Sequence, residues 1–99
     1  MNGKRARPVV LHDGLTHPAW VVLQIARELV DYPDAVVCEE TRSDSGRTSI
    51  INLHVATRDV GRLLGKKGDH TEAMRVLLRA AGGAVGRNYT LEIHDHRSA

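Results

Sequence analysis

The chain has 99 residues, which suffice for one domain with a small core but not for two. Hydrophobic residues make up 41% and charged residues 26%, as in ordinary folded proteins, and no apolar run is long enough to span a membrane. The first residues show no signal peptide, so a cytoplasmic location is expected. The single cysteine, Cys38, excludes an internal disulfide and is expected to be a small buried residue.

The net charge of +2 hides an uneven distribution of charge along the chain. Residues 8–56 carry three basic and seven acidic side chains, whereas residues 57–99 carry eight basic and five acidic ones. A basic second half favours a localised site for phosphate groups. Aromatic residues make up only 3% and phenylalanine is absent, so the stacking surfaces of RRM and OB-fold domains are missing. Any binding of RNA must therefore rely on helices and backbone.

Residues 1–14 show no sustained periodicity and contain a basic cluster, which predicts a flexible basic extension. One domain is expected over residues 15–95, followed by a polar tail at residues 96–99. The domain opens with a helix start signal, in which Thr16 can cap the helix and Pro18 is tolerated in the first turn. An amphipathic helix is predicted up to about Pro33, because apolar residues recur at helical spacing. They are Ala19, Val22, Leu23, Ala26, Leu29 and Val30.

A β-hairpin is predicted next. A β-prone segment at residues 34–41 and an alternating segment at residues 49–55 flank a stretch rich in turn formers at residues 41–48. The alternation places three apolar residues on one face of the second strand, namely Ile51, Leu53 and Val55. Asn52 and His54 lie on the other face. His54 is expected to be a sheet-surface residue, because no second metal ligand stands beside it.

Two helices and a last strand follow. Thr57 can cap a short helix that ends at Gly65, with Asp59 complementing the helix dipole in the first turn. A longer helix begins at Asp69 and is expected to end at the glycines of residues 82–86. Its buried stripe is predicted to contain Ala73, Met74, Leu77, Leu78 and Ala81. Residues 88–94 resume strand alternation, with Tyr89, Leu91 and Ile93 on one side.

The loop Gly65-Lys66-Lys67-Gly68 between the two helices is the strongest functional signal. Its glycines permit positive φ angles and leave room for a close partner, and its lysines supply positive charge. A Gly-x-x-Gly loop between two helices is typical of KH domains, which hold about four nucleotides against the main chain. A nucleotide-binding P-loop is excluded, because three residues rather than four separate Gly61 from Gly65 and no Ser or Thr follows Lys66. A plain surface turn with solvated lysines remains open as an alternative.

Other motifs are weaker. The glycines at residues 82–86 follow a helix and precede a strand, which is the reverse of a dinucleotide-binding fingerprint. His94 and His96 face the same way on a strand, but two histidines without further ligands make a poor metal site. No nucleophile with a base and no convergent pair of carboxylates can be placed around the loop. The sequence therefore predicts no enzyme, no cofactor, no metal and no small-molecule substrate.

Residues 19–95 resemble the small single-KH bacterial RNA-binding proteins of the KhpA (YlqC) type. The resemblance rests on Ile25–Asp34 (IARELVDYPD), Leu53–Ala56 (LHVA) and Asp59–Gly68 (DVGRLLGKKG), and it continues through Ala73-Met74-Arg75, Leu77-Leu78 and Ala80-Ala81. It implies an α+β protein with the type II KH fold, in the order α-β-β-α-α-β. Three helices would cover one face of a three-stranded mixed sheet, and residues 41–48 would form the variable loop that flanks the binding groove.

The resemblance also implies a function. The protein would hold single-stranded RNA and act as an RNA chaperone or post-transcriptional regulator, as a homodimer or with a KhpB (Jag)-type partner. Loop N–H groups and lysines would meet phosphates, two arginines would flank the track, and two leucines would receive bases. The expected RNA-binding residues are Arg62, Leu63, Leu64, Gly65, Lys66, Lys67, Gly68, His70 and Arg75.

Two positions depart from the family pattern. Asp69 puts an anion beside the loop, and His70 stands where such proteins usually carry an apolar residue. Asp69 can cap its helix, and His70 can stack on a base or donate to a phosphate. These departures and the few aromatic residues support a second hypothesis, in which the domain is a protein–protein assembly module whose RNA binding is weak or lost.

Overall fold

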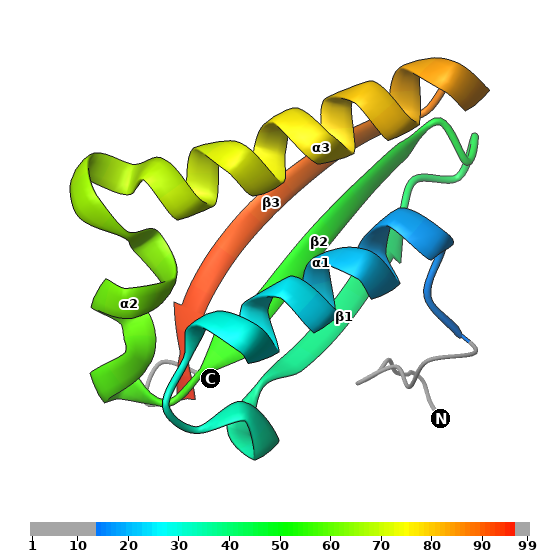
Figure 1. Cartoon of the computed structure of the whole chain (residues 1–99). Coiled ribbons are helices and arrows are strands. Elements are labelled where there is room, and N and C mark those ends of the chain that lie inside the picture. The colour runs from blue at the N-terminus through cyan, green and yellow to red at the C-terminus, as the bar shows by residue number, and fades with distance from the viewer. Residues whose placement is uncertain (1–13, 97–99) are drawn as a thin grey trace, which may run out of the picture.

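The computed structural model describes residues 14–96 and contains one three-stranded sheet in the order β1-β2-β3 (Figure 1). The strands are β1 (Val37–Arg42), β2 (Thr48–Val55) and β3 (Asn88–Asp95). β1 and β2 pair antiparallel as a hairpin, whereas β3 pairs parallel to β2. The parallel pairing requires a long crossover, which the chain between residues 56 and 87 provides. The predicted hairpin and mixed sheet are thereby confirmed.

Within residues 14–96, three α-helices and three short 3₁₀ turns accompany the sheet. Helices α1 (His17–Leu29) and α3 (Asp69–Val85) lie across the same face of the sheet, and α2 (Val60–Leu64) stands at one end of it (Figure 1). The 3₁₀ turns are η2 (Pro33–Ala35), η3 (Thr57–Asp59) and η4 (Lys66–Gly68). This arrangement confirms the predicted α+β fold. Over residues 14–96, no helix is long and apolar enough to cross a membrane.

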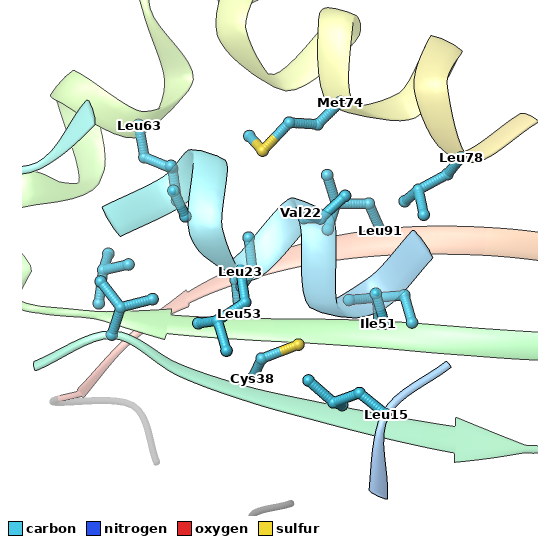
Figure 2. Packing of buried hydrophobic residues seen from close by; sticks show 14 of the residues in the cluster. Leu15, Val22, Leu23, Cys38, Ile51, Leu53, Leu63, Met74, Leu78 and Leu91 are labelled. Carbon is cyan, nitrogen blue, oxygen red and sulfur yellow. The ribbon is translucent and has the colours of Figure 1, made fainter. Parts of the chain in front are cut away.

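The core lies between the sheet and the helices. Ile51, Leu53 and Val55 are all 0% exposed, which confirms the face predicted from their alternation. Apolar side chains from α1, α2 and α3 meet them from the other side (Figure 2). They include Val22, Leu23, Leu63, Met74 and Leu78. Cys38 on β1 is buried in the same cluster, as expected.

The end of α3 differs from the prediction. The helix continues through Gly82 and Gly83 to Val85, and Gly86 ends it in the left-handed region with φ 71°. Gly82 is buried, and a Cβ there would collide with the carbonyl of Arg87, the residue before β3. This packing outweighs the weak helix propensity of glycine. The predicted buried stripe was wrong at Ala73, which is exposed, since the inward side of α3 is formed by Thr71, Met74, Leu78 and Gly82.

The turn between β1 and β2 also lies elsewhere than expected. The turn leads into β2 at Thr48, whereas the chain leaves β2 toward α2 at the other end, after Val55. At the turn, the N–H of Asn88 donates to the carbonyl of Arg47 at 2.6 Å. The turn therefore lies beside the end of α3 rather than beside the Gly65–Gly68 loop (Figure 1). Of the predicted extension at residues 1–14 and tail at residues 96–99, only Gly14 and His96 are among the described residues.

Candidate nucleic-acid interface

The loop Gly65–Gly68 joins α2 to α3 in an unusual backbone conformation. Gly65 and Gly68 both have φ 77°, and Lys67 has φ 53°. Positive φ angles are easy for glycine but cost a residue with a Cβ roughly 1–2 kcal/mol, so Lys67 carries strain. Strain of this kind is often found where a backbone is shaped for a ligand.

Two backbone donors of the loop are available to a ligand. The N–H of Gly65 donates to Gly61 at 3.0 Å, the N–H of Gly68 donates to Gly65 at 3.2 Å, and the N–H of Asp69 donates to Lys66. The N–H groups of Lys66 and Lys67 donate no hydrogen bond within residues 14–96. Both lysine side chains are exposed. The loop therefore offers an anion two N–H donors and two ammonium groups within one short stretch.

His70, at the start of α3, stabilises the loop through a contact with α2. Its Nδ1 donates to the carbonyl of Arg62 at 2.8 Å, so the ring spans from α3 back to α2. A Cβ on Gly65 would lie 2.7 Å from the His70 Cγ and 2.9 Å from its backbone N. Position 65 therefore requires glycine both for its φ angle and for the space that His70 takes. His70, expected as a ligand contact, also packs against Gly65 and stabilises the loop conformation.

The two predicted arginines lie on either side of the loop with different partners. The Arg62 Nε donates to Asp31 Oδ2 at 3.1 Å, and both side chains are largely exposed, so the pair is weak. The Arg75 Nη2 donates to the carbonyl of Leu91 at 3.0 Å. Because β3 is an edge strand, this bond shows that Arg75 reaches over the outer edge of the sheet.

The two predicted leucines have opposite environments. Leu64 is 37% exposed and lies directly before the loop, where it can contact a base. Leu63 is 0% exposed and points into the core beneath α2, so the expectation that it receives bases is wrong (Figure 2). The reason is the short helix itself, in which adjacent residues point about 100° apart and only one of the two leucines can face outward.

Asp59 has a role that sequence reasoning missed. Its side chain is 0% exposed and makes no capping bond within its own helix. Instead the carboxylate accepts hydrogen bonds from the N–H groups of Asp31 at 3.0 Å and Tyr32 at 2.9 Å. It thereby ties the start of α2 to the segment after α1. The partners lie 28 and 27 residues away, so no local pattern could have revealed them.

Asp69 does not cap α3 as expected. Gly68 occupies the N-cap position, with no side-chain capping bond, and Asp69 lies exposed in the first turn. A carboxylate there interacts favourably with the helix dipole but remains an anion beside the lysines.

Three histidines cluster on the sheet face opposite the core: His54 on β2, its neighbour His94 on β3, and His96 directly after β3. The His54 ring stacks on His94 at 4.9 Å between centroids and on His96 at 6.2 Å. The His54 Nε2 bonds to Glu39 at 2.8 Å and the His94 Nε2 to Asn52 at 2.8 Å. Across residues 14–96, no group of three or more His, Cys, Asp or Glu side chains is placed to hold a metal ion.

Comparison with known proteins places this geometry in a family. Residues 20–93 match the model of the KhpA/KhpB KH domain. The RNA-binding protein KhpA of Treponema pallidum is 41% identical over 75 residues, which cover 76% of this chain and 91% of that protein. The RNA-binding protein KhpA of Listeria monocytogenes is 36% identical over 73 residues, which cover 74% of this chain and 93% of that protein.

The RNA-binding protein KhpA of Aquifex aeolicus is likewise 36% identical over 73 residues, covering 74% of this chain and 90% of that protein. The matched region begins in α1 and ends in β3, so it includes β1, β2, most of β3, the loop and the helices on either side of it. The chain therefore belongs to the KhpA/KhpB KH-domain family.

Proposed function

We propose that this protein is a non-enzymatic, cytoplasmic RNA-binding protein that holds single-stranded RNA at the Gly65–Gly68 loop and acts as an RNA chaperone or post-transcriptional regulator. The observation that carries the proposal is the pair of N–H groups at Lys66 and Lys67 that find no acceptor within residues 14–96, each next to its own exposed ammonium group. The names of the similar proteins, all RNA-binding protein KhpA, support the same ligand.

The phosphates of the strand would meet the loop. The two lysine N–H groups and side chains supply charge-assisted hydrogen bonds, and the N-terminus of α3 adds the positive end of its dipole. Arg62 and Arg75 flank this position from α2 and α3. Each of these contacts is to the sugar–phosphate backbone, so each contributes affinity without reading sequence.

The bases would meet a small apolar and polar surface. Leu64 is the exposed apolar side chain next to the loop, and His70 adds an aromatic ring there. With so few stacking partners, preference among sequences is expected to be weak. One domain holding about four nucleotides should bind in the micromolar range, near −8 kcal/mol.

Tighter binding would come from pairing of domains. A homodimer, or a complex with a KhpB-type KH protein, brings a second loop close to the first. The effective concentration of that second site raises the affinity for a long strand by roughly 10²-fold without new contacts. The family, whose model covers the KH domains of both KhpA and KhpB, supports this part of the proposal.

A competition experiment tests the proposal. A labelled short single strand is displaced by an unlabelled short single strand, by a longer one that spans two sites, or by a perfect duplex. The single strands should compete and the duplex should not, because a duplex cannot place splayed bases beside the loop. In an assembled dimer the longer strand should compete better than the short one. Tight binding of the duplex, or no binding of any RNA, would contradict the proposal and favour a protein-binding module.

A further inference from the structure

A hollow of about 280 Å³ lies where α3 ends and β3 begins, at the other end of α3 from the Gly65–Gly68 loop. No expected site residue lines it. Its walls are two arginine side chains, three glycines, an amide and one aromatic ring. The lining residues are Arg79, Gly82, Gly83, Gly86, Arg87, Asn88 and Tyr89.

The glycines of α3 keep this hollow open. Gly82 lets the helix approach the Arg87 backbone, and its carbonyl accepts the N–H of Arg87 at 2.9 Å. A Cβ on Gly83 would meet nothing within 4 Å, so Gly83 borders open space. Any larger side chain at position 83 would extend into that space. Helix propensity alone disfavours two consecutive glycines in a helix. Here Gly82 permits the close approach to Arg87, and Gly83 leaves space beside the hollow unfilled.

The two arginines can both turn their guanidinium groups to a ligand. The Arg87 Nη1 donates to the buried Ser49 Oγ at 3.2 Å, which fixes the side chain and leaves most of its five donors without an acceptor within residues 14–96. Arg79 pairs with Glu72 at 3.5 Å, and these side chains are 66% and 62% exposed. An ion pair so exposed is weak, so an incoming anion can replace Glu72 at little cost. Arg79 and Arg87 both line the hollow, and once Arg79 leaves Glu72 two guanidinium groups can meet there, which suits a phosphate.

The hollow lies on the side of α3 that borders the edge strand. Arg75, Arg79 and Gly82 follow one another at spacings of four and three residues, so they share one side of the helix. The bond from Arg75 to Leu91 shows that this side faces β3. From Asp69 to Gly82 the helix rises by about 20 Å. A strand held at the loop and running along this side of α3 therefore passes Arg75 and arrives at the hollow.

We infer that this hollow binds a phosphate group of the same single-stranded RNA, beyond the nucleotides that the loop holds. The inference rests on the proposed function and extends the binding site from one end of α3 to the other. Arg79 and Arg87 hold the phosphate, and Gly83 provides the room for it. The domain then contacts a longer strand than the roughly four nucleotides of a loop-only site.

Binding of two oligonucleotides of repeated sequence, four and eight nucleotides long, tests the inference in the full chain. The variants are Arg79→Gln, which removes one guanidinium, and Gly83→Glu, which puts a carboxylate into the hollow. Arg42→Gln is the matched control, because Arg42 is an exposed arginine on the opposite edge strand, β1. Arg87 is left unchanged because of its bond to the buried Ser49.

Arg79→Gln should lower the affinity for the eight-nucleotide strand about tenfold, as expected for one charge-assisted contact, and leave the four-nucleotide strand unaffected. The slope of log K against log salt for the longer strand should fall by about 0.7. Gly83→Glu should act in the same direction, and Arg42→Gln should change neither strand. Equal effects of Arg79→Gln on both lengths, or none on either, would overturn the inference while leaving the proposed function intact.

A free nucleotide carries the same phosphate chemistry, so the amide resonances of residues 82–87 are followed while a nucleoside monophosphate is added. Weak, unsaturated shifts support the assignment to an RNA strand. Saturation at micromolar nucleotide, abolished by Arg79→Gln, would make a free nucleotide the ligand and overturn that assignment. Failure of the wild-type chain to bind either oligonucleotide would instead contradict the proposed function itself.

Discussion

The buried carboxylate of Asp59 accepts a 2.9 Å hydrogen bond from the backbone N–H of Tyr32, and with the matching bond from Asp31 it holds the base of α2 against the segment that follows α1. Because the loop begins directly after α2, the hydrogen bonds of Asp59 also determine where the loop lies. The position of the candidate interface thus depends on a carboxylate that no ligand touches.

Asp59→Ala should lower the free energy of unfolding by about 2–4 kcal/mol, because two backbone N–H groups lose a charged acceptor in a buried place. Asp31→Ala is the control: among the described residues 14–96 its side chain forms only the exposed pair with Arg62, so the loss should stay below about 1 kcal/mol. Urea unfolding of both variants gives the comparison. Equal stability of the two would show that the Asp59 hydrogen bonds contribute little.

Leu63→Ala and Leu64→Ala should separate stability from binding. Leu63 is fully buried, so its truncation should cost about 2–5 kcal/mol of unfolding free energy. Leu64→Ala should change stability by less than about 0.5 kcal/mol and weaken RNA binding. Thermal unfolding and RNA titration of each variant provide the test. Unaltered RNA affinity in Leu64→Ala would exclude Leu64 from the interface.

Two glycines only four residues apart should respond to alanine in opposite directions. Gly65→Ala places a Cβ against His70 at a φ of 77°, so it should destabilise the chain by roughly 1–2 kcal/mol or more and weaken RNA binding. Gly61→Ala meets no atom within 4 Å and lies in α2, so it should stabilise by about 0.5–1 kcal/mol. Chemical unfolding measures both. A stabilising Gly65→Ala would be incompatible with the loop geometry.

Cys38 should make stability fall at high pH. Burial, together with a smaller contribution from the nearby carboxylates of Glu40 and Glu39, raises the pKa of its thiol from an ordinary 9.0 to about 12. Between these two values the unfolded chain loses the thiol proton while the folded chain keeps it, so the folded state binds more protons and stability falls as pH rises. Below about pH 9 the effect is absent.

Cys38→Ala isolates this effect from the titration of tyrosines and lysines. Its unfolding free energy should be lower at neutral pH because of the cavity, but it should decline less steeply than that of the wild type above pH 9. Parallel curves for the two proteins between pH 8 and pH 10.5 would contradict the raised thiol pKa.

Periodicity and turn chemistry were sufficient to predict the hairpin, its buried face and the loop between two helices, whereas the mixed three-stranded sheet followed from the family resemblance. Ile51, Leu53 and Val55 illustrate why, since alternation in a strand maps directly onto the two faces of a sheet. The end of α3 was mispredicted because propensity is a local quantity and the contact of Gly82 with Arg87 is a tertiary one.

Polar contacts distant in sequence were not predictable. Thr16 occupies the N-cap of α1 as expected, but its hydroxyl accepts no capping bond from the helix. It donates to Glu40 at 3.0 Å and accepts a hydrogen bond from the Tyr89 hydroxyl at 2.9 Å. Asp59 is a further example, because folding alone brings its carboxylate to the N–H of Tyr32. Arg79 is another, because folding alone places it beside the hollow. The residue types around the loop carried the functional signal, whereas the structure was needed to separate Leu63 from Leu64.

The double substitution Lys66→Gln with Lys67→Gln tests the central claim most directly. Both lysines are exposed, so the unfolding free energy should stay within about 0.5 kcal/mol of the wild type or rise slightly. If each lysine meets one phosphate, affinity for single-stranded RNA should fall strongly, and the slope of log K against log salt should decrease by about 1.4. Arg42→Gln, on the opposite edge of the sheet, should leave both quantities unchanged. An intact double variant that binds RNA with the wild-type affinity and salt slope would contradict the assignment of the loop as the phosphate-binding site.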